Sequence, residues 1–332
     1  MNKANPMRSI ALPLNPEAMS DKRSSASFTG SMRRLLTALL ARSGRQGKMV
    51  ALIGTLTLAG VMVFGTTSFA VSGIAVPENF VFIPGGEFTM GSPLSEANRQ
   101  INETQHQVRL SDFYISRYPV TSAEFRKFVK ATGYLTDAEK ANDQKHWRHG
   151  VSGTLRPNSE DNHPVVYMSW NDAVAYCNWI SQHTGRKFRL PTEAEREYAC
   201  RAGTATPFNS GQSLTTERAN YNGQNPSGNK PKGVYRENTV AVNSFAPNAW
   251  GLYNMHGNVW EWCSDWFDPA FYEQCKAAGT VTNPDGPEDG SRRVLRGASW
   301  FDFEEHCRSA YRIGGAPLAR NPNVGFRLVF VP

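Results

Sequence analysis

Gly251-Leu-Tyr-Asn-Met-His-Gly-Asn-Val-Trp-Glu-Trp262 follows neither the period of a helix nor that of a strand. This stretch holds glycines, side-chain amides, one carboxylate and three bulky aromatics within twelve residues. Such a composition suits a loop whose backbone carbonyls and oxygen side chains converge on a hard cation. The alternative is a packed core loop that turns at its glycines. Two shorter stretches have the same mixed character, Arg296-Gly-Ala-Ser-Trp300 and Val324-Gly-Phe-Arg327.

These stretches also carry a family resemblance, which extends from Phe80 to Val331. Over this span the chain resembles the formylglycine-generating enzyme, or sulfatase-modifying factor, family. The other matching blocks are Phe82-Ile-Pro-Gly-Gly-Glu-Phe-Thr-Met-Gly91, Tyr118-Pro-Val-Thr121, His163-Pro-Val-Val166, Ser169-Trp170, Tyr176-Cys-Asn-Trp179, Arg189-Leu-Pro-Thr-Glu-Ala-Glu195 and Glu197-Tyr-Ala-Cys-Arg-Ala-Gly203. One departure is Arg196, where the family usually has tryptophan, and we interpret it as a surface difference.

The resemblance implies an α+β, C-type-lectin-like domain with little regular secondary structure. The residues themselves indicate three short helices, each opened by a capping box in which a hydroxyl and an acid three residues later satisfy free amides. The boxes are Thr121 with Glu124, Ser169 with Asp172, and Thr192 with Glu195. Strands are predicted at Phe80–Ile83, Val108–Ile115, Arg293–Leu295 and Gly325–Val331. The stretch 203–248 is rich in Asn, Gly, Pro and Ser, which predicts irregular structure.

Charge is distributed unevenly along the chain. The formal net charge is +7, and the first 70 residues hold nine basic and two acidic side chains, which leaves 27 of each sign in the remainder. Because nucleic-acid binding needs a basic stripe on the folded part, we expect no nucleic-acid partner. The seven histidines lack the spacing of a zinc motif. The run His146-Trp-Arg-His149 is interpreted as a solvated loop rather than a ligand pair.

The N-terminal 70 residues indicate a leader for export. Residues 49–64 form an uncharged apolar run, and Ser68 and Ala70 place small residues at the usual cleavage positions. We therefore predict a periplasmic or secreted protein. If the run is not cleaved, its roughly 22 residues are long enough to span a bilayer, so a membrane anchor with the domain outside is the alternative. Translation from Met32 would leave a leader of more ordinary length.

The predicted domain organisation follows from this leader. Residues 1–70 hold the signal peptide or anchor, residues 71–79 a short linker, and residues 80–332 one sulfatase-modifying-factor-like domain.

Cysteines bear most directly on the chemistry. In the family's oxidases, two cysteines separated by four residues follow a Gly-Gly-Ser motif and bind copper(I), and O2 then oxidises a substrate cysteine to formylglycine. Here Gly297-Ala-Ser299 matches the motif, but Asp302 stands at the first cysteine position. Counting forward from Ser299 places Cys307 at the second position. Counting back from Gly325-Phe-Arg327 places Cys307 outside the catalytic register, and both assignments stay open.

The resemblance implies a structural partner for Cys307. The family's oxidases have a disulfide at positions that match Cys200 and Cys307, and this bridge would close a loop of about 107 residues and contribute up to roughly 4.7 kcal/mol. A surviving catalytic thiol and a buried free thiol are the alternatives for Cys307. Cys177 is predicted to lie in the core, and Cys263 and Cys275 are a candidate pair.

Calcium is the cofactor that the resemblance implies most directly. One family site matches Asn254 and Glu261, which offer side-chain oxygens, and Gly257 and Val259, which offer backbone carbonyls. A second site would begin at Asn220 and Tyr221, although its later acidic ligand is not recognisable between residues 232 and 238. An ion held by such hard oxygens would fix a loop rather than catalyse.

Two functions are compatible with the resemblance. The first is a divergent exported accessory or binding protein, or an enzyme with altered chemistry, similar to the pyoverdine-maturation protein and the accessory protein of copper nitrite reductase. Its partner would be a peptide, protein or small-molecule ligand in the cleft. Four side chains at the rim would then serve in proton transfer, namely Asp302, Glu304, Glu305 and His306. A solvated acidic turn, paired with Arg308 and Arg312, is the alternative for this segment.

The second function is the family's formylglycine-generating oxidase, with copper as cofactor and a cysteine-bearing peptide as substrate. Cys307 would be its redox thiol, and Ser299 and Trp260 would line the oxygen pocket. The aspartate at position 302 opposes this reading, because a carboxylate is a hard ligand that suits copper(I) poorly. We therefore favour the first function.

Overall fold

Three capped helices frame the domain in a computed structural model, which describes residues 78–226 and 231–331. The helices are α1 (Ser122–Thr132), α3 (Trp170–Thr184) and α4 (Glu193–Arg201), and each begins with the predicted capping box. At α1, for example, the Glu124 amide donates to Thr121 Oγ1 at 3.2 Å, while the Thr121 amide donates to the Glu124 carboxylate at 2.8 Å. The predicted leader, its cleavage site, the alternative start and the linker as far as residue 77 lie outside the described residues.

Other helices escaped the sequence analysis. The single turn α2 (Asp137–Lys140) has a capping box of its own, whereas α5 (Phe271–Ala278) has no side-chain cap. Two 3-10 turns complete the helical elements, η1 (Asn158–Glu160) and η2 (Glu304–Cys307). Among the described residues, no helix has the length and apolarity needed to cross a membrane.

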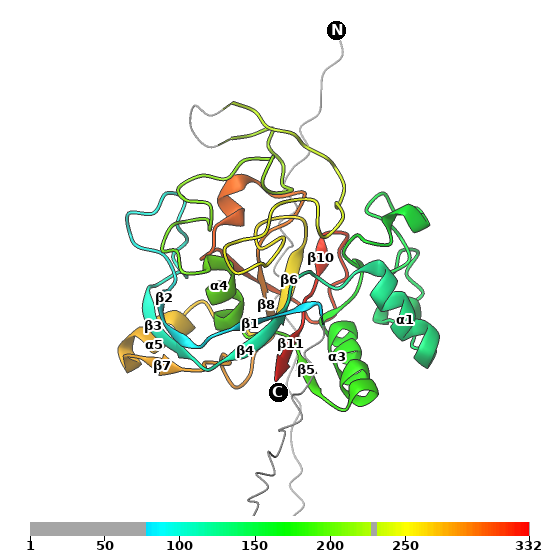
Figure 1. Cartoon of the computed structure of the whole chain (residues 1–332), viewed down its shortest axis with the longest axis horizontal. Coiled ribbons are helices and arrows are strands. Elements are labelled where there is room, and N and C mark those ends of the chain that lie inside the picture. The colour runs from blue at the N-terminus through cyan, green and yellow to red at the C-terminus, as the bar shows by residue number, and fades with distance from the viewer. Residues whose placement is uncertain (1–77, 227–230, 332) are drawn as a thin grey trace, which may run out of the picture. The chain divides into compact units, whose positions relative to one another are not determined.

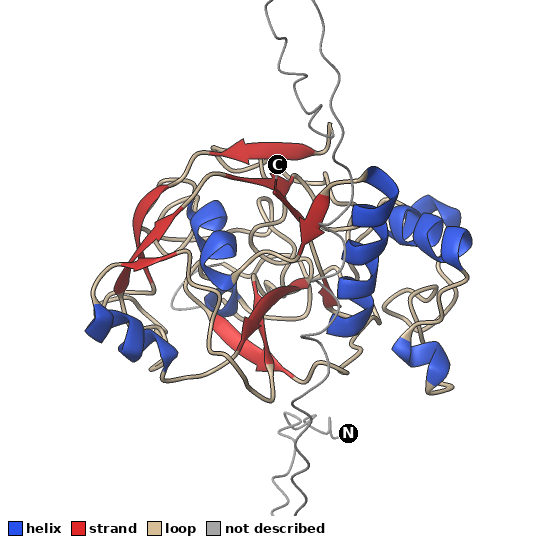
Figure 2. Ribbon diagram, turned by 90° about the horizontal axis from the view of Figure 1, so that it is seen from below, coloured by secondary structure: helices blue, strands red, loops and turns tan. Residues whose placement is uncertain are grey.

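Short strands form three small sheets. The first sheet has the order β1 (Phe80–Ile83), β4 (Phe113–Ser116), β11 (Val329–Val331) and β5 (Lys187–Arg189), all antiparallel. The second has the order β10 (Val324–Gly325), β6 (Trp260–Trp266), β8 (Arg293–Arg296) and β9 (Arg312–Gly315). The third joins β2 (Gly86–Met90), β3 (His106–Leu110) and β7 (Val281–Thr282). Figure 1 shows α1 and α3 on one side of β6 and β10, with β2, β3 and α5 on the other, and Figure 2 gives the perpendicular view.

The predicted strands lie where the structure has strands, but two of them are each divided into two shorter strands. The predicted strand Val108–Ile115 is interrupted at Ser111 and Asp112, where the Asp112 carboxylate accepts a hydrogen bond from the Gly85 amide at 2.6 Å. The predicted strand Gly325–Val331 is likewise broken between β10 and β11. The predicted irregular stretch is confirmed, because its described residues contain neither a helix nor a named strand.

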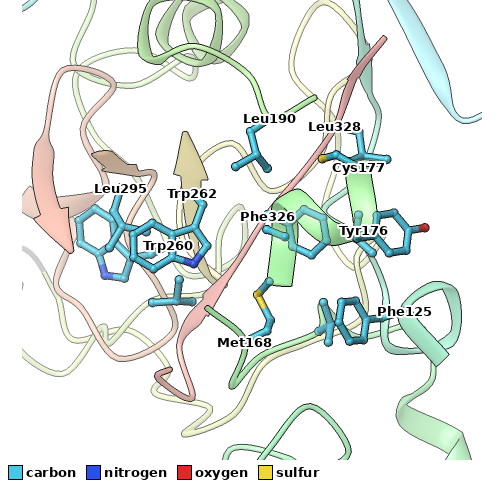
Figure 3. Close-up of a cluster of buried hydrophobic side chains, with 14 of the residues drawn as sticks. Phe125, Met168, Tyr176, Cys177, Leu190, Trp260, Trp262, Leu295, Phe326 and Leu328 are labelled. Atoms are coloured by element: carbon cyan, nitrogen blue, oxygen red, sulfur yellow. The ribbon is translucent and has the colours of Figure 1, made fainter. Parts of the chain in front are cut away.

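Aromatic side chains fill the main core. Phe326, which follows β10, lies 5.5 Å from the Tyr176 ring of α3 and 6.5 Å from the Phe125 ring of α1. Figure 3 shows Phe326 between these rings and the two tryptophans of β6. Cys177 lies beside Leu328 in this cluster and is 3% exposed, so its predicted core position is confirmed. The core therefore ties the C-terminal Val324-Gly-Phe-Arg327 stretch to β6, which begins within the Gly251–Trp262 stretch.

Candidate functional site

Glu261 is the centre of a fully buried ionic cluster at the end of the loop that opened the sequence analysis. Arg196 Nε lies 2.6 Å from Glu261 Oε2, and Arg327 donates to both carboxylate oxygens at 2.6 and 2.8 Å. None of the three side chains is more than 1% exposed. Burial raises the pKa of Glu261, but the two arginines outweigh burial and lower it below its usual value. The carboxylate is therefore held ionised between two cations.

The backbone loop is bonded to the same two arginines. Arg196 Nη2 donates to the Met255 carbonyl at 3.0 Å, and Arg327 Nη2 donates to the Tyr253 carbonyl at 2.9 Å. The interpretation of Arg196 as a surface difference is thus wrong. Arg196 lies on the buried face of α4 and reaches Glu261 on β6.

A second buried network lies beside the first. Arg312 forms two hydrogen bonds with Glu193 at 2.7 and 2.8 Å, and Arg296 pairs with Glu197. Arg308 binds Glu103 at 2.7 Å and also Glu96. The expectation that Arg308 and Arg312 pair with the acids near Asp302 is therefore wrong. These arginines instead connect β9 and the segment after η2 to α4 and to the loop between β2 and β3.

Cys307 faces the protein interior rather than the rim. Its side chain is fully buried, and its carbonyl accepts a hydrogen bond from His256 Nδ1 at 2.7 Å. The His256 ring nitrogens lie 3.7 and 3.8 Å from the sulfur of Cys200. Burial, followed by the charges of Asp302 and Glu304, raises the pKa of the Cys307 thiol well above its usual value. Cys307 therefore lies in an interior environment, in which burial and the neighbouring carboxylates favour the protonated thiol.

All five cysteines, each within the described ranges, are free thiols in the structure. The expected Cys200–Cys307 bridge and the candidate Cys263–Cys275 pair are therefore not formed in it. Cys200 Sγ has other neighbours, since it donates to the Met255 carbonyl at 3.5 Å and lies 3.7 Å from Ser309 Oγ. Burial raises the pKa of the Cys200 thiol, but His256 and Arg196 outweigh burial and bring it to about 6.

We expect all five thiols to titrate when the protein is denatured without reductant, and fewer than one to react in the native state. The reason is that each cysteine is buried, which blocks the reagent even where the thiolate is populated. Ellman titration in buffer and in guanidinium measures both numbers. A count of three, with Cys200 and Cys307 in one linked peptide, would contradict the structure.

Asp302 marks the accessible part of the candidate site. Ser299 Oγ donates a hydrogen bond to the Asp302 carboxylate and accepts one from Asn323 Nδ2 at 3.2 Å. His306 Nδ1 lies 3.6 Å from the other Asp302 oxygen, and the side chains of His306 and Asp302 are 30% and 18% exposed. The His306 ring is 4.9 Å from that of Tyr311, which neighbours Trp260 at 6.1 Å. A half-buried carboxylate and an imidazole thus lie together, beside the ring of Tyr311.

Comparison with known proteins decides the family. A model of the sulfatase-modifying factor enzyme 1-like domain matches residues 71–331. This chain belongs to the sulfatase-modifying factor family. The family fold expected from the sequence is thereby confirmed.

Individual family members differ in what their names say they do. The chain is 38% identical over 285 residues to the formylglycine-generating enzyme of Streptomyces coelicolor, covering 74% of this chain and 87% of that protein. It is 32% identical over 289 residues to the bovine inactive C-alpha-formylglycine-generating enzyme 2, covering 75% and 87%. Among solved structures, PvdO from Pseudomonas aeruginosa matches with a TM-score of 0.62 and 33% identity over 76% of this chain and 94% of PvdO.

The calcium site that sulfatase-modifying factors imply does not fit the residues around Glu261. Both oxygens of this carboxylate are already bonded to arginines, and the Gly257 carbonyl accepts a hydrogen bond from the Val259 amide at 3.0 Å. Asn254 Oδ1 is a buried acceptor without a partner. A loop whose one carboxylate is bonded to two guanidinium groups is a poor site for a divalent cation, because the cations already neutralise that carboxylate.

The second implied calcium site, at Asn220 and Tyr221, offers no negatively charged ligand from these two residues. Asn220 is fully buried, and its side-chain amide donates to the Asn238 carbonyl at 2.8 Å and to Asn258 Oδ1 at 3.1 Å. The Tyr221 hydroxyl donates to the Leu214 carbonyl at 3.0 Å. Over the described ranges, no group of three or more His, Cys, Asp or Glu side chains could hold a metal ion. Asn220 Oδ1 is a buried acceptor without a hydrogen-bond partner.

Copper(I) does not fit the remaining candidates. A two-sulfur site needs paired thiolates, yet Asp302 occupies one position and the Cys307 thiol is buried with a raised pKa. Trp260 is 4% exposed and packs in the core beside Trp262. Of the oxidase residues, the structure therefore brings together Ser299 and Asp302 but not a pair of sulfurs.

Two cavities border Glu304, on the segment that follows Asp302. One, of about 340 Å³, includes Phe208 and Glu305 in its wall, and the other, of about 270 Å³, includes Tyr221. Glu304 itself is 4% exposed and accepts a hydrogen bond from the Leu214 amide at 3.1 Å. Glu304 thus stabilises the wall between the cavities, while Glu305 lines the first.

Sequence reasoning missed the residues that act through long-range contacts. His256 lies in the opening stretch, yet its position between Cys200 and Cys307 depends on three segments far apart in the sequence. Arg327 was quoted for its resemblance, but its pairing with Glu261 had no local signal. The sequence held one signal for these contacts, namely the charged Arg196 at a position where the family usually has tryptophan.

Proposed function

We propose that this chain is an exported, divergent sulfatase-modifying factor protein that binds a ligand at Asp302 and acts on it by proton transfer. The single observation that carries the proposal is the half-buried Asp302–His306 pair, with Ser299 bonded to the carboxylate. A carboxylate oriented by a hydroxyl and close to an imidazole can accept and return a proton on a bound molecule. The leader and the cysteine-poor rim support export and altered chemistry.

Aromatic side chains supply a contact surface beside this pair. Phe301 is 57% exposed, and the Trp300 ring is stacked on that of Tyr235 with centroids 6.2 Å apart. Exposed rings next to a charged pair favour a ligand with both an apolar part and an ionisable hydrogen. A peptide, a protein side chain or a small molecule would meet this description.

The formylglycine-generating oxidase is the second candidate, favoured by the 38% identity to the Streptomyces coelicolor enzyme. The experiment incubates a synthetic cysteine peptide with the domain, copper and air, and detects formylglycine by mass spectrometry. We expect no product, because the domain lacks the second thiolate. Copper-dependent product that disappears in Cys307→Ser would overturn our proposal in favour of the oxidase.

Asp302→Asn provides the matching positive test. The ligand is first identified by thermal-shift screening. We expect the variant to turn this ligand over about 10²–10⁴-fold more slowly than the parent, because asparagine keeps the Ser299 contact but cannot take a proton. Asp289→Asn, at an exposed position away from the site, is the control. Equal turnover in the two variants would contradict a proton-transfer role for Asp302.

A further inference from the structure

A cavity of about 650 Å³ lies apart from Asp302, against α1. Its wall is formed by α1, by the loop after α2 and by the segment before η1, and includes Arg126, Val129, Leu135, Trp147, Leu155 and Arg156. Figures 1 and 2 show α1 at the edge of the domain, on the side of β6 away from α5. The run His146-Trp-Arg-His149, predicted to be a solvated loop, supplies part of this wall. That prediction was wrong for Trp147, which is 3% exposed.

Arg156 is a buried cation without a hydrogen-bond acceptor. It is 9% exposed, and in the described part of the chain none of its three guanidinium nitrogens has a hydrogen-bond partner. The Glu160 carboxylate is 3.6 Å away, too far for a hydrogen bond. Burial lowers the pKa of Arg156, although Glu160 and Asp161 counteract it. A buried guanidinium without hydrogen-bond acceptors normally costs stability, so an acceptor that reached it would be stabilising.

Trp147 Nε1 is a second buried donor without a partner in the same wall. The Trp147 ring is fixed by Phe125, 5.6 Å away, and by the Arg148 guanidinium 5.1 Å above it. Two other charged side chains of the wall already have partners. Arg126 is paired with Asp161, and the Glu139 carboxylate accepts hydrogen bonds from the Thr136 amide and hydroxyl at 2.9 and 2.8 Å. The donors left free therefore demand an acceptor that carries negative charge.

Apolar side chains border these donors. Leu135 and Leu155 are 57% and 68% exposed, although large aliphatic side chains usually avoid water. Val129 and Tyr134 complete the apolar part of the wall. A ligand that satisfied Arg156 and Trp147 Nε1 would bring its remaining body against these side chains.

We propose that this cavity binds a carboxylate carried on an apolar body, such as an acyl chain. The carboxylate accepts hydrogen bonds from the Arg156 guanidinium and Trp147 Nε1, and the apolar body covers Leu135, Leu155 and Val129. The planar guanidinium matches the geometry of a carboxylate, which favours this group over a more strongly hydrated phosphate. The site is independent of the chemistry proposed at Asp302.

Thermal unfolding with decanoate, below its micelle concentration, tests the proposal. We expect decanoate to raise Tm by at least about 2 °C. Inorganic phosphate carries negative charge but no apolar chain, and decyltrimethylammonium carries the chain with a positive charge. Both compounds are expected to leave Tm unchanged. Absence of a decanoate shift, or an equal shift with either control compound, overturns the proposal.

Arg156→Met separates a binding role from a structural one. Without ligand the variant is expected to have a higher Tm than the parent, because a buried charge that lacks hydrogen-bond acceptors is replaced by an apolar side chain of similar length. Decanoate should bind it about 10- to 100-fold more weakly, since the charged hydrogen bonds are lost. A lower Tm with an unchanged decanoate affinity would show that Arg156 is a structural partner of Glu160 and would overturn the proposal.

Two further variants complete the design. Arg148→Gln removes an exposed cation above Trp147 and is expected to weaken decanoate binding without loss of stability. Lys276→Gln removes an exposed cation on α5, away from the cavity, and should change neither quantity. A decanoate affinity equally reduced in both variants would indicate a general charge effect and contradict a defined site.

Discussion

Glu261→Gln is expected to lower the free energy of unfolding by about 3–5 kcal/mol, because it removes the charge that Arg196 and Arg327 share. Both guanidinium groups are at most 1% exposed, so water cannot replace the lost carboxylate. Glutamine preserves the shape of the side chain, which restricts the loss to electrostatics and hydrogen bonding. Guanidinium unfolding curves of the parent and the variant measure the difference in free energy of unfolding, provided that both curves have the same dependence on denaturant concentration.

A surface pair supplies the matched control for this prediction. Glu87 pairs with Arg109 between β2 and β3, but their side chains are 52% and 60% exposed. Glu87→Gln is therefore expected to cost no more than about 1 kcal/mol. If Glu261→Gln cost no more than Glu87→Gln, the buried cluster would not have the structural role that its geometry indicates.

Chelation of calcium is expected to leave Tm of the parent protein unchanged, whereas the variant Arg196→Trp becomes calcium-dependent. The substitution restores the usual family residue and removes one of the two cations that neutralise Glu261, which leaves the carboxylate with Arg327 as its one cationic partner and makes the loop less positive. At a calcium concentration about 100 times Kd, binding would contribute about 2.7 kcal/mol. For a domain of this size that corresponds to a rise in Tm of roughly 5–10 °C.

Calorimetry with EDTA and with millimolar calcium measures this dependence. The double variant Arg196→Trp with Glu261→Gln is the control, because it lacks the carboxylate that would hold the ion and should not respond to calcium. A fall of several degrees in Tm of the parent protein on chelation would contradict the assignment of Arg196 as the resident cation of this loop.

Local signals in the sequence predicted the helices well. The Thr121, Ser169 and Thr192 boxes satisfy their amides within four residues, so their geometry needs no tertiary information. Strand breaks were harder to predict. Ser111 and Asp112 interrupt an apolar pattern, but the contact that fixes the break comes from Gly85, in the connection between β1 and β2.

Side-chain roles at the site depended on contacts between distant segments. The sequence located Ser299 and Asp302 correctly as neighbours, because only three positions separate them. It left the role of Cys307 open, because counting forward from Ser299 and counting back from Gly325 placed this cysteine at different family positions. The inward position of Cys307, beside His256, is fixed by a hydrogen bond across 51 residues. Arg196 was misplaced for the same reason, because its partner Glu261 lies on a different element.

Copper(I) titration of the purified domain tests most directly the claim that the family scaffold has lost its dithiolate chemistry. Competition with a chromophoric copper(I) chelator reports affinity and stoichiometry, and Cys307→Ser reports whether the sulfur takes part. We predict no tight binding and no difference between the parent and Cys307→Ser. Tight binding of one copper(I) ion per chain that is abolished in Cys307→Ser would contradict this claim and restore the oxidase.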